Sequence, residues 1–144
     1  MKAKILVLCT GNSCRSQMAE GIIRVMDPDF EVYSAGTRPE KNVNPYAIEV
    51  MKEIGLDISG HHPKKVDEFT GKDFDYVITV CDNAKEVCPV FTGNVKHRIH
   101  KGFEDPYNAT GSNEEKKVVY RKVRDQITEA FKEIFCEVNY LFRN

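Results

Sequence analysis

A short apolar run near the N-terminus limits the folds open to this chain more than any other feature. Residues 5–8 are Ile-Leu-Val-Leu, which is typical of a parallel strand covered by helices on both faces. Three further strand-like runs, at residues 31–34, 76–80 and 95–99, alternate with helical patterns. Strands that alternate with helices predict an α/β fold. We expect a four-stranded parallel sheet flanked by helices on both faces, with residues 95–99 at an edge.

Turn and capping residues separate these strands. A helix is expected to follow the first strand, and Asn44 with Pro45 predicts the N-cap and first residue of a second helix. A short helix can form over residues 82–87, where Asp82 or Asn83 can act as the cap. Residues 101–112 are polar and lack periodicity, so they form a loop long enough to be functional.

The C-terminal part of the chain predicts one long helix. Ser112 and Glu115 form a capping box, and apolar residues follow at spacings of three and four. Cys136 lies on this helix, and packing is its simplest role. We expect all the elements to belong to one domain over residues 1–144.

Charge and composition exclude several classes of partner. The 21 basic and 22 acidic side chains leave a formal charge of −1, and without a basic block we expect neither nucleic acid nor a membrane surface as partner. No segment approaches the roughly 20 apolar residues of a membrane helix, and the N-terminus lacks a signal-peptide pattern. We expect a cytoplasmic protein, and a monomer because no exposed apolar stripe stands out. In that reducing compartment the five cysteines need a reason other than structural disulfides.

The most informative motif is Cys9-Thr10-Gly11-Asn12-Ser13-Cys14-Arg15-Ser16, a C-x5-R-S pattern between the first strand and the first helix. Five residues can wrap a tetrahedral anion so that successive backbone N–H groups point inward at a helix N-terminus. The Arg15 guanidinium then offers a planar pair of donors to two oxygens of the same anion. The predicted oxyanion-binding residues are Thr10, Gly11, Asn12, Ser13, Cys14 and Arg15.

Cys9 is the expected nucleophile. A ring of donors stabilises its thiolate, which is the form that attacks, and Ser16 is placed to donate a hydroxyl hydrogen bond to the sulfur. The alternative is a buried cysteine at a strand end beside a surface arginine. Cys14 is either a second redox partner or a small residue that faces the helix. Gly11 and Asn12 suit the backbone angles of such a loop, including left-handed ones for Asn12.

The segment from Cys9 to Gly21, Cys-Thr-Gly-Asn-Ser-Cys-Arg-Ser-Gln-Met-Ala-Glu-Gly, resembles the thioredoxin-coupled arsenate reductases built on the low-molecular-weight protein tyrosine phosphatase fold. The likeness continues through residues 32–36, through Asn44-Pro45 and through Asp105-Pro106. It implies a phosphotyrosine phosphatase I-like fold. Reductases and phosphatases share the loop motif, so the motif identifies the superfamily and not the reaction.

Both reactions begin with attack by Cys9 on the central atom of an oxyanion while an acid protonates the departing oxygen. Asp105, stiffened by Pro106, is the expected acid because the resemblance places an acid before a proline. Glu104 is its competitor, and a solvated loop carboxylate is the alternative for either residue. Tyr107 departs from the reductases and suggests phosphatases that receive phosphotyrosine.

Cys81 and Cys88 decide between the reactions. A phosphatase needs water to finish, whereas reduction of arsenate needs the two electrons of a dithiol. The resemblance implies that Cys81 attacks the Cys9 adduct, releases arsenite and forms a Cys9–Cys81 disulfide. Cys88 then resolves it as Cys81–Cys88, which thioredoxin reduces. Seven helical steps separate α-carbons by about 10 Å, but a disulfide needs roughly 4.4–6.8 Å, so a helix between the two cysteines must unwind on oxidation.

Other interpretations of these cysteines remain open. They can be two packed residues on a short helix, or zinc ligands together with His97 and His100, although their spacing is wider than in common structural zinc sites. His61 and His62 are expected on the solvated surface.

We expect no cofactor apart from one candidate ion. Some reductases of this family bind potassium through groups that resemble Asn12, Glu20 and Ser34. Here Lys64 stands where an acidic residue would help to hold the cation, so either the ammonium replaces the metal or the site is lost.

Three classes of function remain: a thioredoxin-coupled arsenate reductase, a tyrosine phosphatase that hydrolyses phosphomonoesters through a Cys9 phosphoenzyme, and a non-catalytic oxyanion- or metal-binding protein. The first two share the oxyanion as ligand and differ in their need for Cys81 and Cys88.

Overall fold

The apolar run near the N-terminus belongs to β1, Lys4–Cys9, which lies in the interior of a four-stranded sheet. The computed structural model describes the backbone of residues 3–82, 86 and 88–143, and within that set the side chains up to Phe135. The strand order is β2-β1-β3-β4, and every pair is parallel. The other strands are β2 (Glu31–Gly36), β3 (Phe74–Thr79) and β4 (Val95–His100). The predicted α/β class, the four strands and the edge position of the last strand are confirmed.

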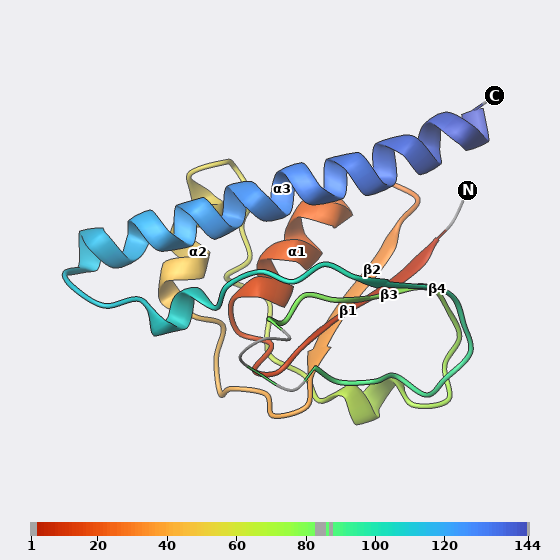
Figure 1. Cartoon of the computed structure of the whole chain (residues 1–144), viewed down its shortest axis with the longest axis horizontal. Coiled ribbons are helices and arrows are strands. Elements are labelled where there is room, and N and C mark those ends of the chain that lie inside the picture. Colours follow the sequence, from red (N-terminus) through yellow and green to blue (C-terminus); the bar gives the residue numbers. More distant parts are fainter. Residues whose placement is uncertain (1–2, 83–85, 87, 144) are drawn as a thin grey trace.

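The two faces of the sheet have unequal covers. Alternate residues of β1 point to opposite faces, and residues 5–8 are completely buried. One face packs against three α-helices, which lie on the same side of the sheet in Figure 1. The opposite face packs against a smaller cluster that includes Phe91 and Phe69, the last residue of the 3-10 helix η1 (Val66–Phe69). The three α-helices are α1 (Arg15–Arg24), α2 (Pro45–Lys52) and α3 (Asn113–Arg143).

The helix-start signals act as predicted. The Asn44 side chain accepts a hydrogen bond of 2.9 Å from the Tyr46 backbone N–H at the start of α2. Ser112 and Glu115 exchange two bonds of 3.2 Å at the start of α3. The short helix considered for residues 82–87 lies mostly outside the described residues, as does the side chain of Cys136.

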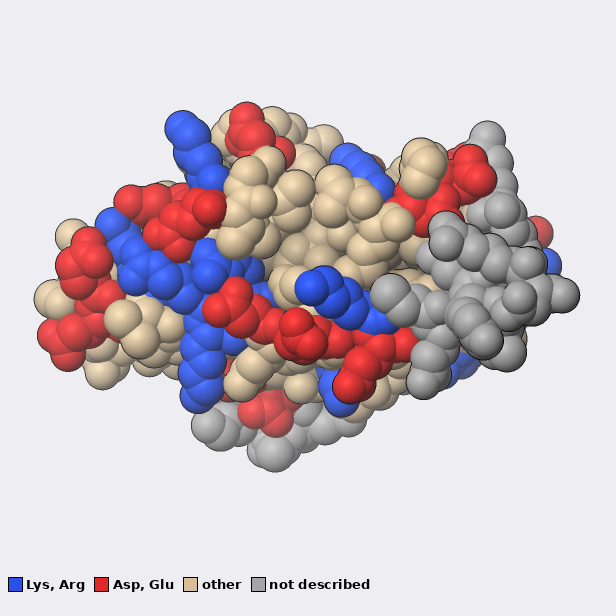
Figure 2. All heavy atoms as spheres, turned by 90° about the horizontal axis from the view of Figure 1, so that it is seen from above, with Lys and Arg blue, Asp and Glu red and all other residues tan. Residues whose placement is uncertain are grey.

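Side chains of both signs are interspersed over α3 and its surroundings (Figure 2). Several of them link α3 to the rest of the molecule: Arg121 binds Glu53 of the α2 C-cap at 2.8 Å, and Lys117 binds Glu49 at 2.8 Å. Exposed ion pairs of this kind each contribute little to stability, so the buried stripe of α3 holds the helix in place. Among the described residues, no helix is both long and apolar enough to span a membrane.

The parallel sheet brings the chemistry-bearing segments to one edge. The carboxyl ends of β1 and β3 lie side by side, because the Val80 backbone N–H donates to the Leu8 carbonyl at 3.0 Å. The polar loop 101–112 reaches the same edge, since Phe103 N–H donates to the Val80 carbonyl at 3.2 Å. This loop contains the 3-10 helix η2, Pro106–Asn108. The edge outside the carboxyl ends of the strands is where open α/β sheets usually bind ligands.

Candidate active site

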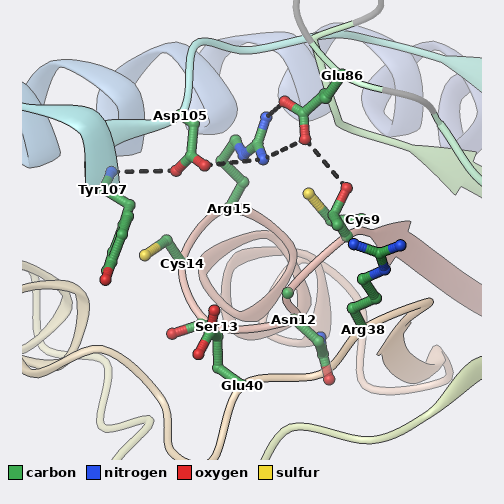
Figure 3. A pocket seen from close by; sticks show the side chains of 12 residues that line it. Cys9, Asn12, Ser13, Cys14, Arg15, Arg38, Glu40, Glu86, Asp105 and Tyr107 are labelled. Carbon is green, nitrogen blue, oxygen red and sulfur yellow. Dashed lines mark hydrogen bonds and ion pairs between the residues drawn. The ribbon is translucent and has the colours of Figure 1, made fainter.

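A cavity of about 250 Å³ opens at the carboxyl end of β1. The loop of residues 9–15 forms its base, and five side chains from other segments complete its wall (Figure 3). Those five residues are Arg38, Glu40, Glu86, Asp105 and Tyr107. The structure therefore brings the predicted oxyanion loop and the predicted acid Asp105 together in one pocket.

The backbone of the loop is turned so that amide groups can face the cavity. The carbonyls of Thr10, Gly11 and Ser13 accept hydrogen bonds of 2.8–3.1 Å from the backbone N–H groups of residues 38, 40 and 44. In a trans peptide the N–H group points opposite to the carbonyl. The amides that follow these carbonyls therefore point away from residues 38–44, in the arrangement that binds anions.

Gly36 at the end of β2 permits this packing. A Cβ atom at that position would collide with the Thr10 carbonyl oxygen. Only glycine allows so close an approach of two backbones.

Asn12 holds the loop from behind. It has a positive φ of 50° and is 1% exposed, which confirms the expected left-handed backbone. Its Nδ2 donates to the hydroxyls of Ser16 and Ser34 at 2.8 and 2.9 Å, and its Oδ1 accepts the Lys64 backbone N–H at 2.9 Å. Asn12 thus contributes its backbone to the pocket and its side chain to the scaffold. Donation from Ser16 to the Cys9 sulfur stays a prediction.

Arg15 is engaged by carboxylates on both sides. Its Nη1 and Nη2 lie 2.5 and 2.9 Å from the two Glu86 oxygens, and Nη2 lies 3.4 Å from Asp105 Oδ2 (Figure 3). Nη1 also donates to the Phe103 carbonyl at 3.1 Å. Burial is the largest single effect and opposes the charge on Arg15, but the hydrogen bonds with Glu86 and the charges of Cys9, Asp105 and Glu86 together outweigh it and raise the guanidinium pKa.

Glu86 is a pocket residue that the sequence did not single out, and the same holds for Arg38 and Glu40. Glu86 accepts further hydrogen bonds from the Thr10 hydroxyl at 3.1 Å and from the Asp82 backbone N–H at 3.0 Å. Burial would raise its pKa, yet Arg15 holds that pKa below the usual value. Glu86 lies between Cys81 and Cys88 in the sequence, but nothing in the sequence distinguished it from a solvated carboxylate.

The Cys9 thiol is free and buried. Burial raises its pKa to about 11, against the opposing effect of Arg15, and the charges of Glu86 and Asp105 add to the increase. This differs from the expected thiolate. The physical reason is burial, which penalises the charged sulfur more than Arg15 stabilises it, while Glu86 and Asp105 add smaller effects in the same direction as burial.

The structure separates Asp105 from Glu104. The Asp105 carboxylate lines the cavity and accepts the Tyr107 backbone N–H at 3.0 Å, which fixes its orientation at the start of η2. Glu104 instead pairs with Lys122 of α3 at 3.0 Å. Placement therefore favours Asp105 as the acid. Tyr107 lines the same cavity, and 65% of its surface is exposed.

Cys81 and Cys88 are joined by a disulfide, with their α-carbons 5.8 Å apart. This is the bond that the family resemblance implied, and the spacing is shorter than the roughly 10 Å of seven helical steps. Cys81 is buried in the core cluster that also contains Cys9. Both sulfurs are consumed by the bond, so in this state they are unavailable as zinc ligands.

Cys14 lies on the α3 side of the loop. Its sulfur is 3.6 Å from the Tyr120 hydroxyl, and burial raises its pKa to about 12. Both observations favour the packing role over a redox role.

The residues of the potassium candidate do not fit a metal cation. Glu20 accepts a hydrogen bond from the Ser34 hydroxyl at 2.9 Å, and its oxygens lie 3.2 Å from Arg24, 3.1 Å from His61 and 3.9 Å from Lys64. Arg24 and Lys64 thus supply positive charge beside the carboxylate, and His61 contacts it as well. His61, expected on the solvated surface, is instead half-buried in this cluster because it contacts Glu20.

The chain is similar in sequence and structure to proteins of one phosphatase and arsenate reductase family. A family model described as low molecular weight phosphotyrosine protein phosphatase matches residues 4–141. An arsenate reductase of Halalkalibacterium halodurans is 47% identical over 132 residues, which cover 91% of this chain and 94% of the relative. A solved arsenate reductase in the oxidized state has a TM-score of 0.75 at 31% identity, covering 96% of this chain and 99% of that one. The thioredoxin-dependent arsenate reductase of Corynebacterium glutamicum has a TM-score of 0.62 at 26% identity, covering 94% and 63% respectively.

Proposed function

Because the chain belongs to the low-molecular-weight phosphotyrosine protein phosphatase family, we propose that it uses the shared anion loop for a redox reaction, the reduction of arsenate to arsenite. The observation that carries this proposal is the Cys81–Cys88 disulfide beside the Cys9 pocket. Hydrolysis of a phosphomonoester has no use for a second and third thiol. The relatives of this chain that are named arsenate reductases support the same assignment.

The first step is formation of a covalent adduct. The loop amides and Arg15 bind the arsenate oxygens, and the Cys9 sulfur attacks arsenic. The bound arsenate dianion takes the proton of the Cys9 thiol. One As–O bond then breaks as the S–As bond forms, and Asp105 protonates the departing hydroxyl so that it leaves as water. The arsenic is still pentavalent at this point.

The second step transfers the electrons. The Cys81 thiolate attacks the Cys9 sulfur, and a Cys9–Cys81 disulfide forms as the S–As bond breaks. The electron pair of that bond stays on arsenic, which leaves as trivalent arsenite. Two sulfurs have been oxidised by one electron each, which balances the two-electron reduction.

The third step moves the disulfide away from the pocket. Cys88 attacks the Cys81 sulfur, Cys9 is released as a thiol, and the Cys81–Cys88 bond of this structure results. An external dithiol then returns both sulfurs to thiols by a further exchange. We propose thioredoxin for this role, as in the thioredoxin-dependent relative. A cycle of this kind requires a reducing compartment, such as the cytoplasm.

A phosphatase is the second candidate function. It is favoured by the family model and by Tyr107, whose exposed ring at the pocket could pack against an aromatic phosphate ester. In that case water replaces Cys81 in the second step.

One comparison of thiol variants tests the assignment. Arsenate-dependent oxidation of reduced thioredoxin is measured for the parent protein and for Cys9→Ser, Cys81→Ser and Cys88→Ser, with Cys136→Ser as the matched control on α3. We expect all three relay variants to lose multiple turnover and the control to keep it. Phosphatase turnover that survives Cys81→Ser and Cys88→Ser, without arsenate-dependent thioredoxin oxidation, would establish the alternative.

A further inference from the structure

The Glu86 carboxylate occupies the side-chain donors with which the pocket would bind an oxyanion. Both terminal nitrogens of Arg15 contact its two oxygens, at 2.5 and 2.9 Å, and the Thr10 hydroxyl donates to one of them at 3.1 Å. The two-pronged arrangement is the one that a guanidinium adopts with any planar pair of oxygens. Glu86 therefore presents to Arg15 the same pattern of acceptors as a bound arsenate or phosphate.

The charges around Arg15 also oppose the binding of an oxyanion while Glu86 is in place. With Glu86 in place, the single guanidinium of Arg15 faces two carboxylates, since Asp105 lies 3.4 Å from Nη2. An incoming dianion meets a site that is already neutralised and loses the donors of Arg15. Oxyanion binding at full strength consequently requires that Glu86 leave.

The position of Glu86 is linked to the redox state of Cys81 and Cys88. Glu86 lies between Cys81 and Cys88 in the chain, and the disulfide holds their α-carbons 5.8 Å apart. Two hydrogen bonds of 3.0 Å join Glu86 to Asp82, which adjoins Cys81. Opening the disulfide removes the covalent restraint on the distance between Cys81 and Cys88, which lie on either side of Glu86 in the chain.

We propose that Glu86 is a positioning residue that occupies Arg15 while the Cys81–Cys88 disulfide is closed and so keeps tetrahedral oxyanions out of the oxidised protein. The inference rests on the proposed function. In the oxidised protein Cys9 is a free thiol, but Cys81 and Cys88 are joined to each other and cannot release an adduct. An arsenate bound at that stage would be trapped, and Glu86 prevents this until the reductant has acted.

The test measures binding of inorganic phosphate by isothermal titration calorimetry to the oxidised and the fully reduced protein. Phosphate probes the oxyanion site without redox chemistry. The variants are Glu86→Gln, Glu86→Ala and Glu40→Gln. Glu40 lines the same cavity but belongs to the opposite wall, so its variant removes one negative charge without removing the Arg15 partner. Mass mapping confirms the state of residues 81 and 88 in each sample.

We expect the oxidised parent protein to bind phosphate about tenfold more weakly than the reduced one, the effect of losing about 1.4 kcal/mol of interaction. Glu86→Gln and Glu86→Ala should both abolish this difference by strengthening the oxidised state. Glu40→Gln should strengthen binding equally in both states and preserve the difference.

Three results would overturn the proposal. The first is equal phosphate affinity of the two redox states in the parent protein. The second is a redox difference that persists in both Glu86 variants. The third is a Glu86 effect that is the same in both states, as a mere change of charge predicts. The assay contains neither arsenate nor thioredoxin, so its failure leaves the proposed reaction standing. Failure of the thioredoxin-coupled assay would refute the reaction without affecting the binding result.

Discussion

Replacement of Asn12 by alanine tests how the anion loop is held in shape. The variant loses four side-chain hydrogen bonds of 2.8–3.2 Å in the buried scaffold. At about 0.5 kcal/mol net for each bond they contribute about 2 kcal/mol. Alanine at a positive φ adds about 1 kcal/mol of backbone strain. We expect Asn12→Ala to lower the free energy of unfolding by about 3 kcal/mol.

Urea unfolding of the reduced protein measures this loss by linear extrapolation. Far-ultraviolet circular dichroism is the suitable signal because the chain contains no tryptophan. Ser13→Ala is the matched control, since its exposed hydroxyl makes one bond of 3.1 Å to the Asn42 carbonyl, and we expect a loss within about 0.5 kcal/mol. A loss for Asn12→Ala no larger than that of the control would refute the reasoning. Asn12→Gly should recover only the part of the unfolding free energy, about 1 kcal/mol, that backbone strain costs in Asn12→Ala.

Three further predictions concern the site chemistry. Asp105→Asn should lower kcat for arsenate reduction by about 10²-fold or more, and a steady-state kcat close to that of the parent would remove Asp105 from the role of acid. In the oxidised protein the raised pKa of Cys9, about 11, keeps the sulfur protonated at neutral pH. Its alkylation by iodoacetamide, followed by mass mapping, should therefore accelerate with pH up to that value, whereas a plateau near neutrality would contradict the burial argument. Exchange of potassium for sodium chloride at constant ionic strength should leave turnover unchanged, because Arg24 and Lys64 already compensate Glu20; strong stimulation by potassium would show that the cluster admits a metal.

Local signals in the sequence predicted the elements that local physics determines. The apolar run of residues 5–8 predicted a buried strand, and Asn44 predicted a helix start, because burial on both faces and side-chain capping depend on a few neighbouring residues. The C-x5-R-S motif predicted the place and curvature of the anion loop for the same reason. The family resemblance, and not the spacing, supplied the pairing of Cys81 with Cys88.

Contacts between distant segments escaped prediction. Glu86 binds Arg15 although 71 positions separate them in the sequence. The residues that neighbour either one in the sequence do not indicate this contact. His61 was expected in solvent because it lies near Pro63 in a predicted loop, but it contacts Glu20 of α1 in a half-buried cluster. The unequal covers of the sheet likewise depend on where whole helices pack, which periodicity alone does not determine.

The hydrogen-bond ladder between β1 and β3 has a consequence for how the proposed relay tolerates change. Neighbouring strands keep a spacing of about 4.8 Å whatever covers them, and Cys9 ends one of these strands while Cys81 follows the other by two residues. Helices on the outside can therefore be repacked by mutation without altering the distance across which the first sulfur–sulfur bond must form. The final sulfur has no such fixed spacing, so we expect natural variants and designed ones to differ mainly in how readily Cys88 reaches its partner.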